Sequence, residues 1–280
     1  MEPKKYQTET AFRRALEDRL KEISRKEDIA FERLRRQVAF DRLLARFFHS
    51  GQSPWLLKGG YAMELRIKDA RTTKDIDLTV RRKLSMSAIP DLLQEHASTD
   101  LSDYFSYTVG RAMMDLAGPI YGGARYPVEA RMDGRIFARF HVDVALGDPP
   151  MEPFEVTQGR DWLGFAGIPR PELQMISREQ QFAEKLHAYT IPRKGAVNTR
   201  VRDLVDMLLL INTGTMDGSK VTHALTLTFD RRQTHPVPAS LPPPPIDWQK
   251  PFAVLAKECG LPDSMDEAFR RVEAFLRSLR

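Results

Sequence analysis

The sequence lacks the features that would place this protein in an oxidising compartment or in a membrane. Its single cysteine, Cys259, excludes an intramolecular disulfide and any zinc site built from several cysteines. No apolar run approaches the roughly 20 residues that a helix needs to cross a bilayer, and the polar amino terminus has no signal-peptide pattern. We therefore expect a cytoplasmic protein that makes no membrane contact.

A strong charge excess is missing as well. The chain has 43 Lys and Arg against 38 Asp and Glu, so its net charge of +5 favours a polyanionic partner only mildly. Residues 8–48 have the periodicity of two amphipathic helices crowded with arginine and lysine. These basic side chains could form a nucleic-acid-binding stripe. Acidic residues interleave with them at ion-pair spacing, however, which leaves an ordinary solvated face as the alternative.

What the sequence does contain is a mixture of strand and helix periodicity that predicts an α+β fold. Short strand-like pieces over residues 51–170 predict a mixed sheet flanked by helices, and residues 1–50 supply helices packed on that domain. The Pro- and Gly-rich stretch 147–175 predicts an irregular covering loop. Residues 171–280 predict a mainly helical carboxyl-terminal domain, in which the proline-rich segment 236–251 should be extended.

Two predicted strands carry acidic residues on one face. In Asp75-Ile76-Asp77-Leu78-Thr79-Val80 polar and apolar residues alternate, so both carboxylates project from the same side. The same alternation places Asp143 outward in the second arm of a hairpin predicted over residues 128–146. If the two strands are neighbours, Asp75, Asp77 and Asp143 surround one small volume.

Carboxylates gathered in this way predict a divalent cation. Their mutual repulsion makes it costly to ionise all of them, and a bound cation relieves that cost. Hard oxygen ligands suit Mg²⁺, with Mn²⁺ as an alternative. Two such ions can activate an attacking hydroxyl and stabilise a leaving pyrophosphate. An isolated Asp-x-Asp pair is weak evidence on its own, because such pairs are common on exposed strands.

A glycine pair upstream strengthens this interpretation. Gly59 and Gly60 follow a predicted strand and precede a short helix. Glycine lets the backbone approach an anion closely, and the helix that follows offers free amides to a triphosphate. A structural tight turn is the alternative for the pair alone. His141 and His187 have no partner at metal-ligand spacing, and we expect packing or surface roles for them.

The motifs together resemble a known family. Lys58-Gly59-Gly60, then Arg71-Thr72-Thr73-Lys74-Asp75-Ile76-Asp77-Leu78, resembles the nucleotidyltransferase superfamily that includes polymerase β. Two later segments, Ala183-Glu184-Lys185-Leu186-His187-Ala188 and Arg200-Val201-Arg202-Asp203-Leu204-Val205-Asp206, narrow the resemblance. Over roughly residues 56–211 the chain resembles the AbiEii toxins, which are nucleotidyltransferase-like toxins of bacterial toxin–antitoxin and phage-defence systems.

The resemblance implies roles for individual residues. It implies that Asp75 and Asp77 hold metal, and that Lys185 and Asp203 are active-site residues contributed by the helical half. An ammonium beside a triphosphate would offset negative charge, which agrees with the role of Lys185. Whether the third metal carboxylate is Asp143 or Asp203 stays open. The residues predicted to bind the nucleotide are Lys58, Gly59, Gly60, Arg71, Thr73 and Asp206.

The resulting expectation is an enzyme that transfers a nucleoside monophosphate from a nucleoside triphosphate to RNA. The resemblance implies the 3′ end of tRNA as acceptor, a consequent block on translation, and a cognate antitoxin as protein partner. Two alternatives remain. The acceptor could be a hydroxyl of a small molecule or protein, or the chain could be a catalytically inactive relative that only binds RNA. Intact Asp75 and Asp77 argue against the inactive relative.

Overall fold

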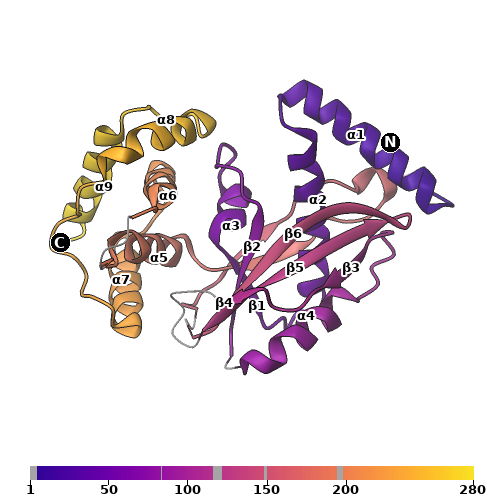
Figure 1. The fold of residues 1–280 in the computed structure, drawn as a ribbon, viewed down its shortest axis with the longest axis horizontal. Coiled ribbons are helices and arrows are strands. Elements are labelled where there is room, and N and C mark those ends of the chain that lie inside the picture. The colour runs from indigo at the N-terminus through magenta and orange to yellow at the C-terminus, as the bar shows by residue number, and fades with distance from the viewer. Residues whose placement is uncertain (1–4, 83, 116–121, 148–149, 194–197) are drawn as a thin grey trace. The chain divides into compact units, whose positions relative to one another are not determined.

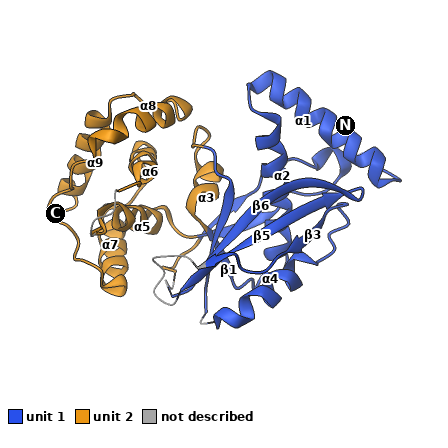
Figure 2. Cartoon of the chain, in the orientation of Figure 1, with its two compact units in different colours: residues 1–57, 72–149, 155–175 blue, residues 58–71, 150–154, 176–280 orange. Residues whose placement is uncertain are grey.

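The computed structural model describes residues 5–82, 84–115, 122–147, 150–193 and 198–280. The chain divides into two compact units, which Figure 2 distinguishes by colour. Unit 1 consists of residues 1–57, 72–149 and 155–175, and unit 2 of residues 58–71, 150–154 and 176–280. The predicted α+β fold is confirmed, with the sheet in unit 1 and a helical carboxyl-terminal region in unit 2. No described helix has the length and apolar character needed to span a membrane.

Unit 1 is built on a mixed sheet, of which Figure 1 labels strands β1 to β6. Along the sheet the strands follow the order β3-β5-β6-β2-β1-β8-β7, and β4 pairs with β5 outside this path. The strands are β1 (Trp55–Lys58), β2 (Asp75–Val80), β3 (Ser106–Val109), β4 (Met114–Asp115), β5 (Gly123–Met132), β6 (Arg135–Ala145), β7 (Glu155–Gln158) and β8 (Glu172–Met175).

The centre of the sheet is formed by β2 and β6, whose sequences alternate most strictly between apolar and polar residues. β2 and β6 run parallel and in register, with Ile76 beside Val142 and Leu78 beside Val144. All four side chains are fully buried. Because successive side chains of a strand point to opposite faces, burial of these apolar residues turns the intervening acidic residues to the other face.

The described residues of unit 1 form three α-helices, and one of them is fixed by a buried ion network. They are α1 (Glu9–Glu27), α2 (Phe31–Phe47) and α4 (Ile89–Ala97). In α2, Phe40 packs edge-on against Phe140 of β6, with ring centroids 4.8 Å apart. Further along the helix, Arg42 and Arg46 both donate hydrogen bonds to the fully buried Asp103. The network anchors α2, because either partner left alone would be a costly buried charge.

Unit 2 packs helices around an apolar core of its own. The helices are α3 (Gly59–Arg66), α5 (Arg178–Thr190), α6 (Val201–Asn212), α7 (Gly218–Arg232), α8 (Gln249–Glu258) and α9 (Met265–Ser278). Their starts have side-chain caps at three places, where Ser177, Asp217 and Ser264 each accept a backbone N–H three residues on. Phe182, Leu204 and Phe252 are among the fully buried core residues.

Two segments differ from the sequence-based expectation. Residues 147–175, which were predicted as an irregular loop, contain the strands β7 and β8. Residues 148–149 of this stretch lie outside the described residues. Both strands have only four residues, and β8 pairs with the distant β1, so the local sequence gives little sign of them. The proline-rich segment also contains the start of α8. Pro251 fits there because the first turn of a helix needs no N–H donor.

Candidate active site

The three predicted acids do lie on neighbouring strands of unit 1. Asp77 of β2 is directly beside Asp143 of β6, and Asp75 is beside His141. All of these side chains are on the face opposite Ile76 and Val142. We call Asp75, Asp77 and Asp143 the acid row. The Asp75 side chain is 32% exposed and that of Asp143 10%, so the row is accessible at one end and covered at the other.

Asp143 is covered by Arg125, which the sequence-based prediction did not include. Arg125 of β5 is directly beside Asp143 on the opposite side from Asp77. Its Nε and Nη2 donate to the two carboxylate oxygens of Asp143 at 2.8 and 2.7 Å. The same Nη2 donates to Asp75 Oδ2 at 3.1 Å. The hydrogen bonds that Arg125 donates to Asp143, together with the nearby Asp75 and Asp77 charges, hold the pKa of Arg125 above its usual value.

Thr73 fixes the exposed end of the row. Its hydroxyl donates a hydrogen bond of 2.8 Å to Asp75 Oδ1, and its own side chain is buried. Asp75 thus accepts one hydrogen bond on each oxygen, from Thr73 and from Arg125. Thr73 was predicted to contact nucleotide, and in the structure it orients a carboxylate.

In unit 2 the glycine pair begins α3. Gly59 has a positive φ of 65°, a conformation that favours glycine because it has no Cβ. Gln181 of α5 donates its side-chain amide to the Gly59 carbonyl at 2.7 Å, and Gly60 is buried. Lys58, just before the pair, forms an ion pair of 3.0 Å with Glu184 of α5. The turn is therefore held on both sides by α5.

The other predicted residues of unit 2 form one buried cluster of charges. Lys185 Nζ of α5 lies 3.0 Å from Asp203 Oδ1 and 2.8 Å from Asp206 Oδ2, both in α6. Arg71 donates to both oxygens of Asp206, at 2.9 and 2.8 Å. We call Arg71, Lys185, Asp203 and Asp206 the lysine cluster. Arg71 was predicted to contact phosphate, and in the structure it anchors Asp206.

The lysine cluster keeps its charges despite burial. Burial alone would lower the pKa of Lys185, but the Asp206 and Asp203 carboxylates raise it above its usual value. Burial would likewise raise the pKa of Asp206, yet Lys185 and Arg71 hold it below its usual value. Lys185 is therefore a permanent cation, suited to stabilising negative charge and unsuited to accepting a proton. Asp203 Oδ2 is buried and has no hydrogen-bond partner within the described part of the chain.

The chemistry of the acid row suits one hard divalent cation at the Asp75–Asp77 pair. Both carboxylates project from one face, and the Asp75 end is accessible. Asp143 fits less well, because the Arg125 guanidinium holds both of its oxygens and its side chain is only 10% exposed. Among the described residues, no group of three or more His, Cys, Asp or Glu side chains is arranged to hold a metal ion.

Sequence reasoning missed Arg125, Gln181 and Glu184. Arg125 has the outward parity of β5, but the predicted strand began only at residue 128. Pro127 is accommodated within β5, beside His141. Gln181 lies one helical turn before Lys185, and Glu184 lies directly before it. Their contacts with the glycine turn depend on how α3 packs on α5, which the local sequence does not reveal.

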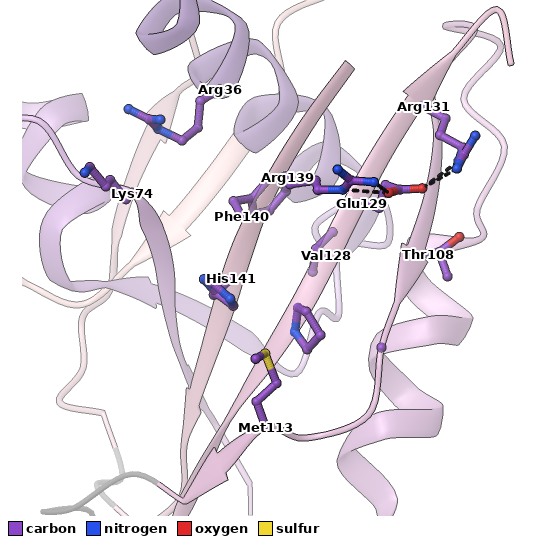
Figure 3. A pocket seen from close by; sticks show the side chains of 12 residues that line it. Arg36, Lys74, Thr108, Met113, Val128, Glu129, Arg131, Arg139, Phe140 and His141 are labelled. Atoms are coloured by element: carbon purple, nitrogen blue, oxygen red, sulfur yellow. Dashed lines mark hydrogen bonds and ion pairs between the residues drawn. The ribbon is translucent and has the colours of Figure 1, made fainter. Parts of the chain in front are cut away.

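A groove of about 780 Å³ lies on unit 1 (Figure 3). Its wall includes Arg36 of α2, Lys74 before β2, and polar residues of β5 and β6. Glu129 forms ion pairs with both Arg131 and Arg139, at 2.6 and 2.8 Å. Arg36 and Lys74 make no ion pair with any described residue. His141, which is beside Asp75 in the sheet, also lines the groove.

Comparisons with known proteins agree with the motifs. A family model described as "Nucleotidyl transferase AbiEii toxin, Type IV TA system" matches residues 42–274. The solved structure of JHP933 from Helicobacter pylori is 14% identical, with 89% of this chain and 92% of that chain covered and a TM-score of 0.49. A candidate nucleotidyltransferase of H. pylori is also 14% identical, with 87% and 96% covered and a TM-score of 0.44. No curated protein matches the chain.

Proposed function

The chain belongs to the AbiEii family of nucleotidyl transferase toxins of type IV toxin–antitoxin systems, and from this premise we propose that it transfers a nucleoside monophosphate from a nucleoside triphosphate to an RNA hydroxyl. The observation that carries the proposal is the register of β2 and β6, which gathers the acid row on one face. We take the 3′ end of tRNA as the acceptor and a cognate antitoxin as the restraining partner. The reaction would take place in the cytoplasm and block translation.

The residues divide the work of the transfer. The acceptor oxygen attacks the α-phosphorus, the bond to the β-phosphate breaks, and pyrophosphate leaves with its negative charge. The hydroxyl proton passes to a carboxylate of the acid row. Backbone amides after Gly59 bind triphosphate oxygens, and Lys185 offsets the charge of the departing group.

Asp75 and Asp77 are the residues that would hold a divalent cation, Mg²⁺ or Mn²⁺. When bound, such an ion supplies Lewis-acid stabilisation of the phosphate oxygens. Thr73 and Arg125 orient Asp75 for this role through the hydrogen bonds described above.

The groove supports RNA as the acceptor class. Its four basic side chains, Arg36, Lys74, Arg131 and Arg139, exceed the one acidic side chain of its lining, Glu129. Basic groups attract a phosphate backbone by releasing its condensed counterions. Arg139 and His141 share the outward face of β6 with Asp143, so a strand bound in the groove would lie on the face that carries the acid row.

The test is to incubate the protein with total bacterial RNA, Mg²⁺ and each of the four α-labelled nucleoside triphosphates. We expect label in RNA with at least one nucleotide, and none with Asp77→Asn. Sequencing the labelled RNA identifies the acceptor and the position of the added nucleotide. Label on protein or on a small molecule would refute RNA as the acceptor, and no label on any component would refute the transferase function.

A further inference from the structure

Arg125 lies beside the acid row, where its positive charge partly neutralises the three carboxylates. Arg125 Nη2 bridges Asp75 Oδ2 and Asp143 Oδ2, at 3.1 and 2.7 Å. The guanidinium holds Asp143 in a two-point contact, which is stronger and more directional than a single hydrogen bond. Arg125, Asp143 and Asp77 follow one another across three adjacent strands, so the backbone itself fixes the arginine in this place.

The formal charges of the acid row and Arg125 indicate how much positive charge the patch can still accept. Three carboxylates and one guanidinium leave two negative charges on this patch of the sheet. One divalent ion neutralises that remainder in the site without nucleotide. The contacts of the two carboxylates differ, because one guanidinium holds both oxygens of Asp143, whose side chain is 10% exposed. Asp75 accepts one bond from the Thr73 hydroxyl and one from Arg125, and its side chain is 32% exposed.

We propose that Arg125 takes the place of a second metal ion, so that the protein binds its nucleotide with one divalent cation, held by Asp75 and Asp77. Asp143 is then a positioning residue, which holds Arg125, and not a metal ligand. This inference rests on the proposed metal-dependent nucleotidyl transfer. It differs from the two-ion arrangement expected from three clustered carboxylates alone.

The experiment counts metal ions. The protein is mixed with Mn²⁺ and a saturating α,β-methylene analogue of each nucleoside triphosphate, which cannot be cleaved at the bond that transfer breaks. After ultrafiltration, the Mn²⁺ and nucleotide retained with the protein are measured. We expect one Mn²⁺ per retained nucleotide for the wild type and for Arg125→Lys, which keeps the positive charge. We expect two for Arg125→Gln, because this variant frees the Asp143 carboxylate.

Two further variants separate the arginine's role from general electrostatics and from loss of folding. Arg139→Gln removes the same charge from the same face of β6 and should still retain one Mn²⁺. Asp143→Asn should also retain one, with little loss of Mn²⁺ affinity, and it tests the proposal if Arg125→Gln fails to fold.

Several results would overturn the inference. These are two Mn²⁺ in the wild type, a second Mn²⁺ in Arg139→Gln, one Mn²⁺ in a folded Arg125→Gln, or a tenfold or greater loss of Mn²⁺ affinity in Asp143→Asn. Nucleotide retained without any Mn²⁺ would instead refute the metal dependence of the proposed function, and the inference with it.

Discussion

The acid row and the lysine cluster are two groups of charges built on opposite plans. The lysine cluster has two carboxylates and two cations, and Asp206 within it is fully buried. The acid row has three carboxylates around one cation, and its Asp75 end is open. A balanced, buried group is stable without a ligand, whereas an unbalanced, accessible one is stabilised by a cation from outside. The comparison predicts that substitutions in the lysine cluster mainly affect folding, and that substitutions in the acid row mainly affect catalysis.

The largest effect should come from the acid row. We expect Asp77→Asn to lower the transfer rate at least a thousandfold, which corresponds to about 4 kcal/mol of transition-state stabilisation. The same change removes one of three mutually repelling carboxylates, so the free energy of unfolding should stay equal or rise. Labelled-nucleotide transfer and urea denaturation measure the two quantities on one preparation. An inactive variant that is also strongly destabilised would break the comparison.

The matching change in the lysine cluster is Asp206→Asn. Asp206 is fully buried and balances both Arg71 and Lys185, so its neutralisation leaves two cations facing only Asp203. We expect a loss of about 3 kcal/mol in the free energy of unfolding, as for other buried ion pairs broken on one side. Urea denaturation followed by circular dichroism measures it. Asp217→Asn, at the exposed cap of α7, is the control and should cost well under half as much.

These two groups also show what sequence could and could not predict. The alternation in residues 75–80 and 140–144 suffices to predict both strands and the face of each acid, because it reflects burial on one side only. The partners of these acids depend on which strand lies next in the sheet, and that is a long-range property. For the same reason sequence did not show that Arg71 and Thr73, which were predicted as phosphate contacts, hydrogen-bond to Asp206 and Asp75. Sequence thus indicated the chemical groups, and the pairing among them required the fold.

A smaller loss of folding stability should appear as the pH falls, and it should come from His187 in unit 2. His187 is buried, with Arg232, His235 and Glu184 around it. Burial, with Arg232 and His235 beside it, lowers the pKa of His187 to about 3. Because the unfolded chain has a histidine pKa near 6.5, it binds a proton below that pH while the folded protein does not. Stability is therefore complete above about pH 6.5 and lost between that pH and about 3.

The loss can be measured as a slope. We expect at most about 1.4 kcal/mol per pH unit from this residue, or roughly 2 kcal/mol between pH 6.5 and 5. Urea denaturation of the wild type and of His187→Gln over this range measures it. The variant, which cannot be protonated here, should show a flatter dependence. Equal slopes in the two proteins would show that another group is responsible.

The smallest effects should come from the groove, where each basic residue acts alone on a flexible polyanion. Lys74→Gln and Arg139→Gln should each weaken binding of a short single-stranded RNA about threefold at low salt. Each should also lower the salt dependence, because one phosphate contact contributes about 0.7 to the slope of log K against log salt for single strands. Fluorescence anisotropy in the Asp77→Asn background measures binding without turnover.

Arg14→Gln is the matched control for this interface. Arg14 is an exposed residue of α1 outside the groove lining, and its loss should leave both the affinity and the slope unchanged. If Arg14 mattered and Lys74 and Arg139 did not, RNA would bind to the charged surface of the amino-terminal helices, and the groove would lose its assigned role. If all three mattered equally, binding would depend on total charge alone. Only a loss confined to the groove variants links RNA binding to the face that carries the acid row.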